Sequence, residues 1–149
     1  MSNVRRFQFV TTIAAPPATV HALMIDPDSY RLWTSAFTEG SYYEGSWQAG
    51  ERIRFLCPSG DGMIAEIAEH RPGRFSSIRH LGFIARGVED TESEAVRAWA
   101  PAYENYTFTA IDAGTELVID QDVAPEYERY MSEAWPKALA KLKSICEHR

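Results

Sequence analysis

Hydrophobic and polar side chains alternate over residues 6–13. A period of two residues is typical of a half-buried β-strand. Residues 20–24 have the spacing of a short helix, and Asp26-Pro27-Asp28 then supply a helix cap, a proline for the first turn and an acidic side chain beside it. The pattern therefore predicts one strand followed by two short helices, the second of which carries Tyr30 and Trp33.

The pattern changes after Gly40, where strand-like runs separated by turns containing glycine or proline begin. Short links of this kind join antiparallel neighbours. The runs cover residues 42–47, 52–57, 63–70, 75–81, 103–110 and 115–123. The one long link, residues 83–100, is rich in acidic side chains between Glu89 and Glu94, and we expect a solvated loop with room for a helical turn.

The last pattern, over residues 125–146, is that of a long amphipathic helix. Apolar side chains recur every three or four residues, and acidic residues precede lysines, which is the charge order that the helix dipole favours. A sheet of six or seven antiparallel strands with one long helix must curve around that helix to cover its own apolar face. We therefore predict an α+β helix-grip fold with a cavity between sheet and helix.

Composition and charge narrow the class of protein. The chain has 149 residues, with 15 Lys plus Arg against 21 Asp plus Glu and a net charge of −6, which predicts one domain over residues 1–149 and no nucleic-acid partner. No apolar run approaches the length of a membrane span, and no signal peptide is evident, so membrane insertion is not expected.

Cys57 and Cys146 form no CxxC motif and are interpreted as structural thiols of a cytoplasmic protein. An edge strand of the predicted sheet could pair with a second copy of the chain, so both a monomer and a homodimer are expected possibilities.

Strand parity places two polar side chains on the side of the sheet that faces the helix. If Ile78 faces the core, His80 shares its side, and if Tyr106 does, so does Glu104. Because their strands follow one another in the sheet, we expect the imidazole and the carboxylate to meet. Such a pair could orient a polar ligand group, act as acid and base, or be a buried pair that stabilises the sheet.

Large apolar residues are candidates for the cavity wall, with a filled core as the alternative. Together with His80 and Glu104, the predicted ligand-binding residues are Trp33, Phe55, Ile78, Trp99, Tyr106, Phe108, Met131, Trp135 and Leu139. Trp99, beside the acidic link, either closes the mouth of the cavity or anchors that link. The sequence contains no recognised catalytic motif and no metal-ligand spacing, so we expect neither catalytic residues nor a cofactor.

Several segments taken together resemble one known family. They are EGSWQAG at 44–50, GMIAEI at 62–67, HLG at 80–82, GVED at 87–90, YENY at 103–106 and WPKAL at 135–139, with Trp99. This set resembles bacterial START-like (SRPBCC) domains, and within them the subgroup named after activator homologues of the heat-shock-protein-ninety ATPase. The resemblance implies a helix-grip fold with a hydrophobic pocket and, through the subgroup name, a chaperone partner and a role in stress response.

Three functions remain open, because this superfamily includes lipid carriers, hormone receptors, cyclases and co-chaperones. The first is binding of a small apolar or amphipathic molecule without catalysis. The second is a cyclase-like or hydrolase-like enzyme in which His80 and Glu104 transfer protons. The third is a co-chaperone-like interaction module, for which the acidic link would suit a basic protein partner.

Overall fold

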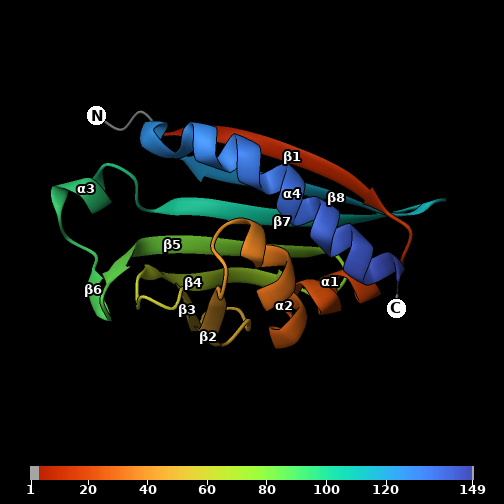
Figure 1. The fold of residues 1–149 in the computed structure, drawn as a ribbon, viewed down its shortest axis with the longest axis horizontal. Coiled ribbons are helices and arrows are strands. Elements are labelled where there is room, and N and C mark those ends of the chain that lie inside the picture. The colour runs from red at the N-terminus through yellow and green to blue at the C-terminus, as the bar shows by residue number, and fades with distance from the viewer. Residues whose placement is uncertain (1–3, 149) are drawn as a thin grey trace.

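The computed structural model describes residues 4–148 as one antiparallel sheet with the helices α1, α2 and α4 on one of its faces (Figure 1). Residues 1–3 and 149 of the predicted domain lie outside the described residues. The sheet has eight strands in the order β1-β8-β7-β5-β4-β3-β2, and β6 pairs with β5. The elements are β1 (Arg5–Ile13), α1 (Pro17–Ile25), α2 (Pro27–Trp33), a 3-10 turn (Thr34–Ala36), β2 (Tyr42–Gly45), β3 (Arg52–Leu56), β4 (Gly62–Arg71), β5 (Phe75–Ala85), β6 (Val88–Asp90), α3 (Glu94–Arg97), β7 (Ala102–Ile111), β8 (Gly114–Val123), a 3-10 turn (Pro125–Tyr127) and α4 (Glu128–Glu147).

Local sequence explains where the short helices begin and end. The Asp26 carboxylate accepts the Ser29 backbone N–H at 3.1 Å and so caps α2, while Pro27 occupies the first turn, where no N–H is needed. At the other end the Thr34 hydroxyl donates to the Tyr30 carbonyl. The Trp33 Nε1–H donates to the Met24 carbonyl at 2.9 Å, which ties α2 to α1 and fixes the Trp33 indole inside the molecule.

The long helix α4 buries one face against the sheet. Trp135, Ala138, Leu142 and Cys146 are all buried, and the helix continues through Pro136. These residues recur at intervals of three and four, which is the spacing that brings side chains to one side of a helix. The predicted α+β helix-grip architecture is therefore confirmed. Among residues 4–148, no helix is both long and apolar enough to cross a membrane.

The long link contains a helical turn, α3, as the expectation allowed, but it also contains strand structure that the sequence did not predict. β5 continues to Ala85 and turns at Arg86 and Gly87, both with positive φ, into the short strand β6, which raises the strand count to eight. Its acidic side chains are partly engaged within the chain, since Glu89 pairs with Arg54 and the Asp90 carboxylate accepts the Ser93 N–H at 3.0 Å. The added residues Phe83, Ile84 and Ala85 are apolar, and Gly82 before them interrupts the alternation on which the strand prediction rests.

A bulge in β5 changes which side chains face the helices. Ala65 lies opposite His80 and Ile64 lies opposite Gly82, so Leu81 has no partner on β4. One extra residue shifts the alternation, and Phe83, opposite Met63, comes to share the face that carries His80. This bulge brings Trp99 into ring contact with both Phe83 and His80.

Candidate functional site

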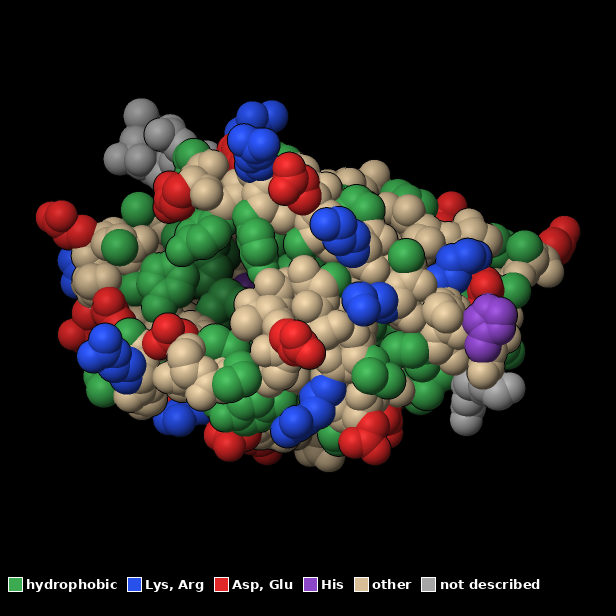
Figure 2. Space-filling view, in the orientation of Figure 1, with side chains coloured by type: hydrophobic (Ala, Val, Ile, Leu, Met, Phe, Trp, Pro, Cys, Tyr) green, Lys and Arg blue, Asp and Glu red, His purple; other side chains and the backbone are tan. Residues whose placement is uncertain are grey.

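A cavity of about 290 Å³ lies between the first half of α4, the segment at residues 34–41 and the central strands. Figure 2 shows it as a hollow with hydrophobic walls, open to the surface, with a histidine visible at its floor. Its lining residues are Tyr30, Trp33, Thr34, Phe37, Thr38, Ser41, Trp47, Phe55, Leu56, Cys57, Asp61, Gly62, Met63, Ile78, His80, Glu104, Tyr106, Gln121, Tyr130, Met131 and Trp135. The volume is close to the lower end of the range of roughly 300–1,000 Å³ usual for small-molecule pockets.

Most of the residues predicted to form the pocket lie in this lining. They are Trp33, Phe55, Ile78, His80, Glu104, Tyr106, Met131 and Trp135. They come from α2, β3, β5, β7 and α4, so elements far apart in the sequence converge here.

Three predicted wall residues lie outside the lining, and these are corrections. Phe108 shares the parity of Glu104 but lies four residues, or about 13 Å, further along β7, where it stacks on His21. Leu139 lies one turn beyond Trp135 and is buried in the core. Trp99 stacks on Phe83 with ring centroids 4.8 Å apart. Parity and periodicity give the face of an element but not how far the cavity extends along it.

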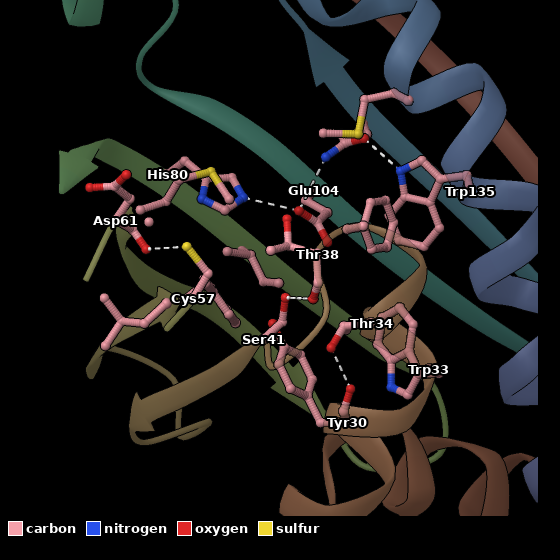
Figure 3. A pocket seen from close by; sticks show the side chains of 18 of the residues that line it. Tyr30, Trp33, Thr34, Thr38, Ser41, Cys57, Asp61, His80, Glu104 and Trp135 are labelled. Carbon is pink, nitrogen blue, oxygen red and sulfur yellow. Dashed lines mark hydrogen bonds and ion pairs between the residues drawn. The ribbon is translucent and has the colours of Figure 1, made fainter. Parts of the chain in front are cut away.

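His80 and Glu104 meet as the strand pairing predicts. Ile78 lies directly opposite Glu104 in the β5–β7 ladder, and the His80 Nε2 atom is 3.0 Å from Glu104 Oε1. The His80 side chain is buried and that of Glu104 is partly buried, with 3% and 13% of their surfaces exposed. Figure 3 shows the imidazole aimed at the carboxylate across the cavity floor.

A chain of hydrogen bonds fixes which atoms donate around Glu104. The Trp135 indole N–H, which can only donate, donates to Gln121 Oε1 at 2.7 Å. The Gln121 amide nitrogen therefore faces Glu104 Oε1, at 3.3 Å, and donates to it. The Tyr106 hydroxyl donates to the other carboxylate oxygen, Oε2. Glu104 thus accepts from Gln121 and Tyr106, and a proton on His80 Nε2 would give it a third donor.

The two buried phenols beside this carboxylate keep their protons. Burial, reinforced by the negative charge of Glu104, raises the pKa of Tyr106 well above its ordinary value. The same causes, in the same order, raise the pKa of Tyr30. At neutral pH both phenols are hydrogen-bond donors and add no charge to the cavity.

The second nitrogen of His80, Nδ1, is buried and has no hydrogen-bond partner among residues 4–148. Phe55 and Trp99 flank the ring, with centroids 5.9 and 5.5 Å from the imidazole centroid. In Figure 3 the ring lies between Glu104 and the turn that carries Cys57 and Asp61. The imidazole is therefore oriented on one side by Glu104 and unsatisfied on the other.

Sequence reasoning missed several lining residues. Gln121 has the same parity in β8 as the buried Ile119 and Val123, so a polar residue at an inward position was an available signal. Cys57 carries a free thiol that contacts Ser59 Oγ at 3.1 Å, and it was interpreted as a structural residue. Nothing in the local pattern indicates that the turn after β3 folds over the cavity.

The described residues contain no group of three or more His, Cys, Asp or Glu side chains arranged to hold a metal ion. The thiol of Cys57 forms hydrogen bonds with Ser59 and with the Asp61 carbonyl, and none with His80. The polar groups of the cavity floor can therefore orient a ligand or exchange a proton with it, without a nucleophile paired to the imidazole.

A curved antiparallel sheet that holds one long carboxy-terminal helix, with two short helices after the first strand, defines the helix-grip class of fold. No protein-family model matches the sequence, and no curated protein matches it either.

Solved structures share the fold over nearly the whole chain. The Aha1 dimer from Colwellia psychrerythraea is 15% identical, with a TM-score of 0.74 and coverage of 96% of each chain. A protein from Mesorhizobium loti is 17% identical, with a TM-score of 0.72 and coverage of 95% of this chain and 96% of that one. CalU16 from Micromonospora echinospora is 16% identical, with a TM-score of 0.64 and coverage of 96% of this chain and 76% of that one. At these identities the similarity shows the helix-grip fold alone.

Proposed function

We propose that this chain is a single ligand-binding domain that holds a small, largely apolar or amphipathic molecule between its sheet and α4, without chemical change. One observation carries the proposal, which is the open hollow of about 290 Å³ with aromatic walls and a small polar floor. Apolar walls with a few converging polar groups are the usual composition of small-molecule sites. We place the protein in the cytoplasm, where a thiol such as Cys57 stays reduced.

Native mass spectrometry of the purified protein tests the proposal by looking for a co-purified small molecule. Calorimetric titration with 2-methylnaphthalene, an uncharged two-ring probe, then tests the cavity itself. We expect saturable 1:1 binding in the wild type. Failure of both measurements would overturn the proposal.

A matched pair of variants locates the binding. Met131 lines the cavity from α4, so Met131→Trp fills part of it and is expected to weaken binding of 2-methylnaphthalene at least about tenfold, or 1.4 kcal/mol. Leu32 is 60% exposed on α2 and lies outside the lining, so Leu32→Trp adds the same side chain without entering the cavity. Equal affinities in the two variants would show that the probe binds elsewhere.

Acid/base catalysis by His80 and Glu104 is a second candidate, because a carboxylate that orients an imidazole with a free nitrogen is an arrangement that enzymes use. The two candidates differ in turnover. Incubation of a co-purified ligand with fresh protein leaves its mass and structure unchanged under the binding proposal, whereas an enzyme converts it.

The assembly is proposed to be a monomer or a homodimer. The Colwellia protein, which shares the fold, is described as a dimer. In this chain β1 forms one edge of the sheet path and offers nine residues for pairing with a second copy. Light scattering distinguishes the two states directly.

A further inference from the structure

The unsatisfied nitrogen of His80 indicates what chemical group the cavity takes. The contact to Glu104 is made at Nε2, and an imidazole that carries its single proton there presents Nδ1 as a hydrogen-bond acceptor. The atom is buried, and it has no partner within residues 4–148. An unsatisfied buried acceptor is unfavourable, so the site gains from a bound group that donates one hydrogen bond.

The neighbouring groups restrict the donor further. The Glu104 carboxylate lies against the same ring and already accepts from Tyr106 and Gln121, so a ligand carboxylate or phosphate would be repelled there. An ammonium group brings three N–H donors, which need several acceptors. A hydroxyl has one proton to give, which matches His80 Nδ1, the one buried side-chain acceptor without a partner among residues 4–148.

The walls define the rest of the molecule. Flat rings surround the hollow, among them Trp33, Phe37, Phe55 and Trp135, and Phe37 meets the Trp135 indole edge to face at 4.9 Å. Such walls favour planar aromatic ligands, whose faces and edges can pack against them.

We propose that the cavity binds a planar aromatic molecule with a phenolic hydroxyl, which donates its proton in a hydrogen bond to His80 Nδ1. This inference rests on the proposed binding function, and it adds the class of ligand and the atom that recognises it.

Three two-ring probes that differ in one substituent test the inference at neutral pH by calorimetry. 2-Naphthol can donate and accept, 2-methoxynaphthalene can only accept, and 2-methylnaphthalene can do neither. We expect 2-naphthol to bind about tenfold more tightly than either of the others. Equal binding of 2-naphthol and 2-methylnaphthalene would overturn the inference while leaving the binding function standing. Equal binding of 2-naphthol and 2-methoxynaphthalene would mean that His80 donates, which also overturns it. If none of the three binds and no molecule co-purifies, the binding function itself fails, whereas a co-purified molecule without binding of the probes overturns this inference alone.

Variants then assign the preference to one atom. In His80→Gln the amide nitrogen can replace Nε2 in the bond to Glu104, while the acceptor at Nδ1 is lost. We expect the preference for 2-naphthol over 2-methylnaphthalene to fall to less than about twofold. Glu66→Gln, which removes an ion pair to Arg79 outside the cavity lining, serves as the control and keeps the tenfold ratio. A ratio that survives in His80→Gln would contradict the assignment, and the wild-type probe series stands as a test even if this variant does not fold.

Discussion

Two histidines, each 2% exposed, are buried on the side of the sheet that the helices cover, and the hydrogen bonding of their rings differs. His21, on α1, has partners on both ring nitrogens, because its Nδ1 accepts the Gly73 N–H and its Nε2 bonds Ser76 Oγ, both at 2.8 Å. His80, four residues beyond Ser76 on β5, has a partner on Nε2 alone. His21 lies where Phe108 fills the interior, and His80 lies where the interior is hollow. The difference separates a histidine that stabilises the fold from one available to a ligand.

The largest expected effect comes from making the same substitution at both positions. Glutamine can replace Nε2 of a histidine but not Nδ1. His21→Gln therefore leaves the half-buried Gly73 N–H without its acceptor, which is expected to lower the free energy of unfolding by about 2 kcal/mol. His80→Gln removes an atom that has no partner, so we expect a loss at least about 1 kcal/mol smaller. Urea denaturation measures the unfolding free energy of both variants. Equal losses would contradict the difference between the two histidines.

Glu104 provides the next test, because it orients His80. Glu104→Gln replaces an acceptor by an amide whose nitrogen must face one of three donors, from His80, Tyr106 and Gln121, and we expect a loss of about 1–2 kcal/mol in unfolding free energy. Glu66→Gln on β4, which is separated from β7 by β5, breaks a partly exposed ion pair at 3.0 Å and should cost about 0.5 kcal/mol or less. Comparable losses would show that the hydrogen bonds around Glu104 stabilise the protein no more than a surface ion pair does.

The pH dependence of stability sharpens the role of His21. Burial, with the neighbouring His70 as a smaller cause, lowers the pKa of His21 to about 4. The unfolded chain, with an ordinary histidine pKa near 6.5, binds more protons between pH 6.5 and pH 4, so stability falls as pH falls through that range. We expect His21 to account for a loss of roughly 1–2 kcal/mol between pH 7 and pH 5. Urea denaturation at the two pH values should show a smaller loss in His21→Gln, and identical losses would contradict the assignment.

The smallest effect is expected at Trp99, which the sequence suggested as either a lid or an anchor. Its stacking on Phe83 and its position outside the cavity lining favour the anchor. Trp99→Leu should therefore change the affinity for 2-methylnaphthalene by less than about threefold while lowering stability. A loss of affinity of tenfold or more, measured by calorimetry, would instead support the lid.

The sequence predicted the fold and the central polar pair because both depend on local periodicity. Strand parity alone brought His80 and Glu104 to one face, and the pairing of β5 with β7 brought them together. The extent of the cavity could not be predicted in this way. Phe108 has the parity of Glu104 but lies under α1, and Gln121 and Cys57 join the lining through the curvature of the sheet and the path of a turn. These features depend on tertiary packing, which no local pattern encodes.

The state of the His80 ring is measured most directly by ¹⁵N NMR of its two nitrogens, with His21 as an internal reference. The predicted spectrum has a protonated Nε2 and an unprotonated Nδ1 in His80, and its Nδ1 signal shifts when 2-naphthol is added while both His21 signals stay in place. A protonated Nδ1 in the free protein, or an Nδ1 signal that 2-naphthol leaves unchanged at saturation, would contradict the role assigned to this atom.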